Sequence, residues 1–406
     1  MQYRKDGEIT LGKATFEGSG EVSDTILDSY AIKSRRSVYQ IEHHLKVLRR
    51  FSPQKARAVA MGCYLSENAE MLGELLGYAL GKGGGRIDVV GSGNLELGLL
   101  PTVQKVVSMG ERLLSCRNVL LFRDWHDYEK ITLAKMVSCS QRLFCPLCGI
   151  ARANKLALGL LEKSLILRDK VPGLRAFFVT TTVKNGVDLQ ERFGHLDSGF
   201  TRLMKRVKEY RRRGGKSSLA GVIGAAASVE VKIGRGSGEW HPHVHALMLT
   251  RSAEISASEL SREWRELTAD SRIVDVREID PADPDAILEI AKYSLKFSEM
   301  SLESNAVAGL LLRRRRLFRT FGEIRGVHLD EDAQDIDDVG MLDGAFSELL
   351  YRYDGDKRKY GLVKVALKSE EMTERELIRS VSRESELQRS GQLWAKKMLN
   401  RKRDYE

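Results

Sequence analysis

Three histidines alternate with other residues in the segment Trp240-His241-Pro242-His243-Val244-His245-Ala246-Leu247-Met248. Side chains of a β-strand point to opposite faces with a period of two. His241, His243 and His245 would therefore share one face, while the intervening apolar residues enter a core. Two imidazoles about 7 Å apart along one strand can close on a single metal ion. The segment predicts a strand that presents metal ligands.

A second alternating segment, Ser228-Val229-Glu230-Val231-Lys232-Ile233, lies just upstream, and glycines at 234, 236 and 238 separate it from the histidines. Two alternating segments joined by such a turn predict an antiparallel β-hairpin. A turn centred near residue 237 would place Glu230 opposite His243 or His245, on the histidine face. We expect these three residues to hold a divalent metal with open positions for a phosphate oxygen. A histidine-rich surface strand beside a chance acidic residue is the alternative.

A third group of reactive side chains lies on a helix expected over residues 285–297, which the pair Asp283-Pro284 would open as N-cap and first residue. Glu289, Tyr293 and Lys296 stand at i, i+4 and i+7, so they share one helix face. A carboxylate, a phenol and an ammonium group therefore converge. A tyrosine that attacks a metal-polarised phosphodiester would keep the bond energy in a phosphotyrosine link.

Four of the five cysteines cluster in the sequence. The run Cys145-Pro146-Leu147-Cys148-Gly149 is a tight knuckle in which two thiolates can reach one tetrahedral ion. We expect a structural zinc ion, with inert buried thiols as the alternative. Its expected ligands are Cys116, Cys139, Cys145 and Cys148. His126 could replace one cysteine, and Cys63 is expected to be a small core residue.

Positive charge is concentrated on a helix expected from about residue 196 to 213. Such a density of like charge favours a polyanionic partner, although a solvated helix face is the alternative. The formal net charge of +10 points in the same direction. The expected DNA contacts are Arg202, Lys205, Arg206, Lys208, Arg211 and Arg212. The run Arg313 to Arg316 is also expected to contact nucleic acid or to be a solvated helix end.

The 406-residue chain is long enough for one large core or for two to three smaller domains, and its composition, 42% hydrophobic and 30% charged, is typical of a soluble globular protein. No apolar run approaches the roughly 18 residues of a membrane-spanning helix, and the first residues lack the apolar core of a secretory signal. Five cysteines are too few for a disulfide scaffold, so their cluster favours metal binding in a reducing compartment. We expect a cytoplasmic protein without a membrane partner.

Four regions are expected along the chain. Residues 1–100 predict a helical N-terminal region, 101–165 a Cys-rich zinc-binding segment, 166–325 a catalytic core, and 326–406 an acidic linker followed by a basic helical region. Residues 175–183 are β-branched and aromatic, which predicts a strand buried on at least one face. The expected fold class is α+β.

Three motifs resemble, in matching order, those of the plasmid rolling-circle replication initiators of the HUH endonuclease superfamily. They are Phe178 to Asn185, the histidine segment Trp240 to Leu249, and Lys292 to Lys296. These initiators often carry a C-x-x-R-L-C-P-x-C segment before the first motif; here Cys139 to Cys145 holds one extra residue. The resemblance covers about residues 110–300 and implies an HUH endonuclease domain with a central antiparallel sheet and flanking helices.

The same resemblance implies an activity. Such an initiator nicks one strand of origin DNA with Mg²⁺ or Mn²⁺, forms a 5′-phosphotyrosine link and frees a 3′-OH primer, then rejoins or hydrolyses the link at termination. Tyr293 would be the nucleophile, Lys296 an electrostatic helper and Glu289 the activator of water. The sequence contains no helicase motif, so a host helicase would unwind the duplex and a host polymerase would extend the primer.

Two other classes of protein share part of the pattern. Histidine-triad nucleotide hydrolases and transferases also carry H-x-H-x-H, and there a histidine attacks phosphorus. That class leaves the cysteines and the Tyr293 helix face unexplained. A non-catalytic zinc-dependent DNA-binding protein would explain the charge and the cysteines but not the histidine hairpin. Three motifs in order favour the replication initiator.

Overall fold

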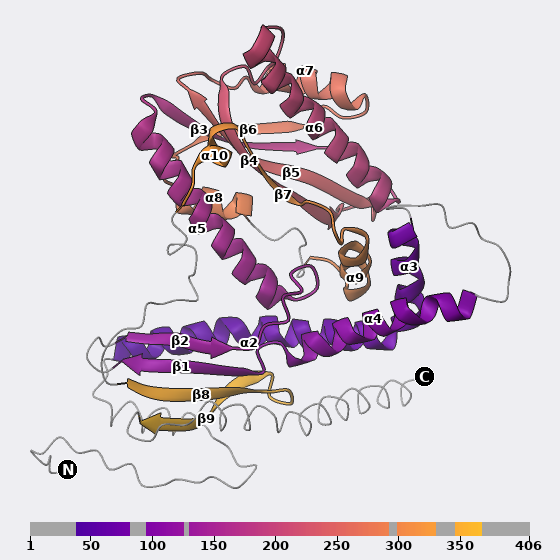
Figure 1. Cartoon of the computed structure of the whole chain (residues 1–406), viewed down its shortest axis with the longest axis vertical. Coiled ribbons are helices and arrows are strands. Elements are labelled where there is room, and N and C mark those ends of the chain that lie inside the picture. Colours follow the sequence, from indigo (N-terminus) through magenta and orange to yellow (C-terminus); the bar gives the residue numbers. More distant parts are fainter. Residues whose placement is uncertain (1–37, 82–94, 126–129, 292–298, 330–345, 368–406) are drawn as a thin grey trace, which may run out of the picture. The chain divides into compact units, whose positions relative to one another are not determined.

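The computed structural model describes residues 38–81, 95–125, 130–291, 299–329 and 346–367 (Figure 1). The chain divides into two compact units. We call Arg57–Leu114 with Cys139–Ile336 the major unit, and Met1–Ala56 with Ser115–Ser138 and Asp337–Glu406 the minor unit. No helix among the described residues is long and apolar enough to cross a lipid bilayer.

The major unit is built on a five-stranded antiparallel sheet with the strand order β6-β3-β5-β4-β7. The expected strand at 175–183 and both strands of the expected hairpin are present, as β3, β4 and β5. The bounds of the strands are β3 Leu174–Thr182, β4 Val222–Ile233, β5 Trp240–Arg251, β6 Val274–Ile279 and β7 Phe318–Phe321.

Helices cover both faces of this sheet (Figure 1). The helices α6 (Leu189–Arg213) and α7 (Ala257–Thr268) pack on one face. The helices α5 (Pro146–Lys170), α8 (Pro284–Ala291) and α10 (Gly322–Gly326) pack on the other. The remaining helices are α3 Ala69–Gly81, α4 Leu95–Ser115, α9 Leu302–Leu311 and α2 Val38–Glu67, which passes from the minor unit into the major one.

Alternation along β5 assigns its side chains to the two faces. Val244, Ala246 and Met248 belong to the core under α6 and α7. Leu247 and Leu249 belong to the core under α5 and α8. This is the period-two pattern expected from the sequence, and it directs the odd-numbered histidines toward the α5 and α8 face.

Short polar side chains start the helices that flank the sheet. Asp188 caps α6 by accepting hydrogen bonds from the backbone N–H groups of the first turn, so α6 begins well before the expected residue 196. Ser256 caps α7 in the same way. The Asp283 carboxylate accepts from the backbone N–H of Asp285 at 2.9 Å, which confirms the expected start of α8.

The minor unit contains a second antiparallel sheet with the strand order β2-β1-β8-β9. Its strands are β1 Val119–Trp125, β2 Lys130–Met136, β8 Phe346–Asp354 and β9 Lys359–Leu367. Phe122, Leu349 and Tyr351 are buried in its core with Leu48 of α2.

Residues 346–367 are therefore strands rather than the linker or helix expected over 326–406. The register of β8 is fixed by β1, which is distant in sequence, so local pattern alone did not indicate the pairing. Residues 368–406, where basic helices are expected, lie outside the described part of the chain. The expected domain boundaries stay predictions.

A tryptophan of α7 links the sheet to its helical cover. The Trp264 side chain is fully buried, and its Nε1–H donates to the carbonyl oxygen of Thr182 at 2.7 Å. We expect Trp264→Phe to lower the free energy of unfolding by about 1–3 kcal/mol, because it removes the donor of a partly buried hydrogen bond and leaves the acceptor unpaired. Urea denaturation followed by circular dichroism measures this difference.

Val187→Ala is the control, since the Val187 side chain is 82% exposed and its truncation should change the free energy of unfolding by less than about 0.5 kcal/mol. Equal effects of the two substitutions would contradict the role assigned to Trp264.

Candidate metal centre on the five-stranded sheet

The β4–β5 hairpin brings the three expected metal ligands together. Glu230 stands directly opposite His243 in the ladder. The Nε2 atom of His243 lies 3.3 Å from Oε1 of Glu230, and the Nε2 atom of His245 lies 3.8 Å from Oε2. One ligand atom from each residue falls within 4.8 Å of the other two. This spacing allows one ion to contact all three side chains.

The two ligand rings approach more closely than their backbone spacing requires. The ring centroids of His243 and His245 are 4.7 Å apart, and the ring planes are nearly perpendicular. Both rings turn toward Glu230 on the neighbouring strand. The orientation of the two imidazole rings, as well as the strand register, therefore brings the three side chains together.

Hydrogen bonds at the far side of each ring orient the ligand nitrogens. The Nδ1 atom of His243 lies 3.4 Å from the carbonyl oxygen of His241, which can only accept, so a proton on Nδ1 would donate there and leave the Nε2 lone pair for a metal. The Nδ1 atom of His245 lies 3.0 Å from Oγ1 of Thr180. When that hydroxyl accepts, Nε2 of His245 is likewise available to a metal.

The donor set fits a divalent cation. Glu230 is 4% exposed and His243 is 3% exposed, so the carboxylate charge is held away from water. A buried carboxylate is costly unless a cation compensates its charge. Two imidazole nitrogens and one carboxylate leave coordination positions open for substrate. The group can therefore use a metal ion for catalysis.

The third histidine of the face is not part of this group. His241 Nδ1 lies 2.6 Å from Oδ1 of Asn185. Burial, with the neighbouring His243 and Lys232 as smaller causes, lowers the pKa of His241 to about 4. The side chain of His241 is therefore neutral at physiological pH. Its contribution to the centre is the backbone carbonyl oxygen, which lies next to Nδ1 of His243.

The helix that leads to the expected nucleophile packs on the same face of the sheet. Ile287 and Ile290 of α8 are buried against Phe178 and Leu247. Glu289 is half-buried on this helix. Tyr293 and Lys296 lie outside the described residues, so their places in the site stay predictions.

Three of the expected zinc ligands meet at the start of α5. Cys139, Cys145 and Cys148 are buried, and the Sγ atoms of Cys139 and Cys148 are 3.5 Å apart. Cys145 is the N-cap of α5, followed by proline, and Cys148 lies in the first turn. Thiolates are stabilised at a helix N-terminus, which suits them as metal ligands.

The other expected residues of the Cys-rich segment fall elsewhere. Cys116 is buried but belongs to the minor unit, so its place as fourth ligand stays a prediction. His126 lies outside the described residues. Cys63 is buried in α2, and burial, aided by the Glu67 carboxylate, raises the pKa of its thiol to about 11. Cys63 is thus a protonated core residue, as expected.

The basic residues of α6 lie on a helix that covers the face opposite the metal centre. Three of them make contacts within the fold, although Arg202 and Arg211 are exposed: Arg206 pairs with Glu263 and Glu266, and Arg211 donates to the carbonyl oxygen of Val222. Arg202 likewise donates to a backbone carbonyl, that of Leu267. Lys205, Lys208 and Arg212 are exposed. The contact of all six with DNA stays a prediction.

Two features near the centre were not expected from the sequence. Thr180 lies in the first of the three motifs, but its contact with His245 depends on the β3–β5 register. Arg142 and Arg152 line a cavity together with the arginine run at 314–316, next to the centre. The arginine run is evident in the sequence, but the sequence does not indicate that Arg142 and Arg152 lie beside it.

Comparison with known proteins identifies the family of the chain. Residues 130–360, more than half of the chain, match the family described as replication protein. "Protein rep" of Streptococcus pneumoniae serotype 2 is 31% identical over 229 residues, which cover 51% of this chain and 67% of that protein. "Protein rep" of Staphylococcus aureus is 30% identical over 198 residues, covering 45% and 80% respectively. No solved structure matches significantly. The chain belongs to the replication protein family, which confirms the family indicated by the motifs.

Thr180 and Thr181 offer a matched pair of substitutions. We expect Thr180→Val to weaken Mn²⁺ binding by about 10–100-fold, because it removes the hydroxyl that orients a ligand histidine. Thr181 points to the opposite face, is 1% exposed, and its Oγ1 has no hydrogen-bond partner among the described residues. Thr181→Val should leave the affinity unchanged.

Isothermal titration calorimetry with Mn²⁺ measures both affinities, and His243→Ala serves as the variant expected to lose binding. Equal Mn²⁺ affinities for Thr180→Val and Thr181→Val would remove Thr180 from the site.

Proposed function

We propose that this protein initiates replication by nicking one strand of DNA at the metal centre, with Tyr293 as the nucleophile. The observation that carries the proposal is the convergence of Glu230, His243 and His245 on the sheet face that also holds α8. Membership of the replication protein family supports it independently. The first line of support is the geometry of the side chains, and the second is sequence similarity.

In this proposal His243 and His245 bind Mg²⁺ or Mn²⁺ through Nε2, and Glu230 binds it through its carboxylate. The bound ion supplies Lewis acidity to the scissile phosphate. The His241 carbonyl and the Thr180 hydroxyl keep both rings in the ligand orientation. The three ligands thus fix where the phosphate must lie relative to the end of α8.

The covalent step uses residues that follow α8. The Tyr293 phenol loses its proton and its oxygen attacks phosphorus, so a tyrosine–phosphorus bond forms while the bond to the 3′ oxygen breaks. The 3′ oxygen takes a proton and leaves as the 3′-OH primer. Lys296 stabilises the negative charge. At termination the 3′-OH of a strand attacks the phosphotyrosine, or Glu289 activates a water molecule for hydrolysis.

Two other parts of the chain have supporting roles in the proposal. Cys139, Cys145 and Cys148 hold a structural Zn²⁺ ion, for which Cys116 is the fourth ligand expected from the sequence. The basic residues of α6 contact origin DNA away from the nick. A host helicase and a host polymerase complete replication.

The tyrosines near the C-terminal end are poor nucleophiles. Tyr351 is 1% exposed in the core of the minor unit, and burial, with Asp124 nearby, raises the pKa of its phenol. Tyr353 is half-buried, and its pKa is raised as well, again mainly by burial. Neither phenol is activated for attack, so neither is a better candidate than Tyr293.

Tyr293 and Glu289 separate the two chemical steps. Tyr293→Phe should abolish the covalent protein–DNA adduct, because it deletes the attacking oxygen alone. Glu289→Ala should still form the adduct but release it more slowly, since only hydrolysis needs a general base for water. Labelled single-stranded origin DNA with Mn²⁺, resolved on a denaturing gel, shows both results.

An adduct that persists in Tyr293→Phe would move the nucleophile elsewhere, with a histidine of the triad as the next candidate. Adduct formation by the wild-type protein in the presence of a chelator would contradict the metal assignment.

Zinc content and stability should fall together when the cysteine knuckle is altered. We expect Cys148→Ser to lose zinc and to unfold at lower urea concentration, because ion binding and local folding are coupled. Cys63→Ser is the matched control: it alters a buried thiol of α2 and should keep its zinc. Elemental analysis of both purified variants measures the metal, and wild-type protein that unfolds cooperatively without zinc would refute the site.

A further inference from the structure

A cavity of about 360 Å³ lies beside the metal centre and is lined by five arginines. They come from three parts of the major unit: Arg142 from the turn before the cysteine knuckle, Arg152 from α5, and Arg314, Arg315 and Arg316 from the segment after α9. Its volume falls in the range of roughly 300–1,000 Å³ that is usual for small-ligand sites.

The floor of this cavity connects it with the catalytic face. Ser228 lines the cavity and stands opposite His245 in the ladder. It is two residues from Glu230 on β4, so the two side chains share one face at a separation of about 7 Å along the strand. Ala291, the last residue of α8, lines the cavity as well. An anion in the cavity is therefore a near neighbour of one at the metal.

The charge of the cavity is not compensated within the described structure. No carboxylate is present among the residues that line it, and none of its five guanidinium groups makes an ion pair or a side-chain hydrogen bond with a described residue. Other arginines of the unit do have carboxylate partners, such as Arg175 with Glu278 and Arg192 with Asp270. The five positive charges of this cavity thus lack a carboxylate partner among the described residues.

Two further observations show that the like charges are held together by the fold. The pKa of Arg152 is lowered, chiefly by burial and also by the charge of Arg142. Arg314 has a φ of +68°, a left-handed conformation that non-glycine residues rarely adopt. In an extended strand, consecutive side chains would point to alternate sides. At the turn around Arg314, three consecutive arginines line the same cavity. Strain and repulsion of this kind are typical of binding sites.

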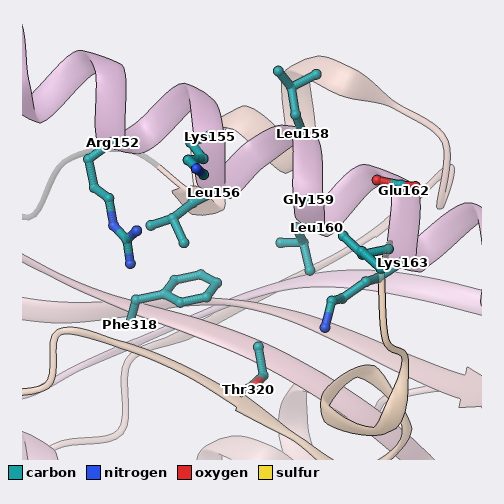
Figure 2. Close-up of a pocket in the computed structure, with 11 residues that line it drawn as sticks. Arg152, Lys155, Leu156, Leu158, Gly159, Leu160, Glu162, Lys163, Phe318 and Thr320 are labelled. Carbon is teal, nitrogen blue, oxygen red and sulfur yellow. The ribbon is translucent and has the colours of Figure 1, made fainter. Parts of the chain in front are cut away.

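An aromatic face adjoins the charge. Phe318 lines the arginine cavity and also the adjoining cavity of about 270 Å³, which shares Arg152 and Leu156 with it. Figure 2 shows Arg152 and Phe318 at the same end of that second cavity, with Lys163 at the other. Alternation of basic groups with an aromatic ring suits a single nucleic acid strand, whose phosphates meet the guanidinium groups while a base stacks on the ring.

We propose that the arginine cavity is a subsite for backbone phosphates of the single DNA strand next to the scissile phosphate. The proposal rests on the function proposed above. The DNA strand would pass over Ser228. One phosphate would lie at the metal, and the neighbouring phosphates would contact Arg152 and Arg315. Bidentate guanidinium groups are well suited to phosphate oxygens.

The test removes two charges from the cavity and two from the opposite face of the sheet. Arg152→Ala/Arg315→Ala is compared with Arg262→Ala/Arg265→Ala, whose arginines are exposed on α7. Fluorescence anisotropy with a labelled single-stranded oligonucleotide, in chelator so that no cleavage occurs, gives Kd at several salt concentrations. We expect the cavity variant to bind at least about 10-fold more weakly and its log Kd–log salt slope to fall by about 0.7 per lost phosphate contact.

Three controls test whether the loss of affinity comes from the lost charges, whether it is specific for single-stranded DNA, and whether a free anion binds in the cavity instead. Arg152→Lys/Arg315→Lys should restore the salt slope, because the charges return, but only part of the affinity, because an ammonium group cannot make the bidentate contact. A salt slope that stays at the value of the alanine variant overturns a phosphate subsite. The same loss on duplex DNA overturns the assignment to a single strand. Calorimetry with inorganic phosphate alone should show no tight binding, and tight binding would assign the cavity to a free anion instead.

The outcome for the subsite is separate from the outcome for the nuclease. Cavity and α7 variants that bind the oligonucleotide equally well overturn the subsite, even if wild-type protein forms the tyrosine adduct. A selective loss in the cavity variant supports the subsite, even if no adduct forms, because the anisotropy measurement needs no catalysis.

Discussion

The antiparallel pairing of β4 with β5 is the constraint on which the centre depends. It places Glu230 opposite His243 and Ser228 opposite His245. A slip of one residue would move the carboxylate to the other face of the sheet, where α6 and α7 pack. The apolar alternation that holds the register therefore also brings the candidate metal ligands together, so the stability of the sheet and the geometry of the candidate site have a common origin.

The sheet separates two kinds of positive charge. The arginines of α6 lie over one face and make several contacts within the fold, to Glu263, Glu266 and backbone carbonyls. The arginines of the cavity lie beside the metal centre on the other face and make no such contacts with described residues. A count of basic residues in the sequence weights both groups alike, whereas the structure gives them different surroundings.

The cysteine knuckle has a place in this arrangement. Cys145 begins α5, the helix that carries Arg152, and Arg142 lies in the turn just before it. The Gln141 amide donates to the carbonyl of Met109, and an Arg112 guanidinium donates to that of Cys139, so the knuckle is tied to α4. A structural ion there would hold the start of α5 in position and, through it, one wall of the cavity.

The sequence by itself determined the β4–β5 hairpin, the two-faced alternation of β5 and the start of α8 at Asp283, because each is encoded in neighbouring residues by strand period, turn glycines or capping groups. Only the tertiary structure decided the pairing of β1 with β8, where Arg123 meets Glu348 across 225 residues. The same holds for the contact of Thr180 with His245 and for the meeting of Arg142, Arg152 and the run at 314–316. These depend on long-range register and on packing between elements, which local periodicity does not specify.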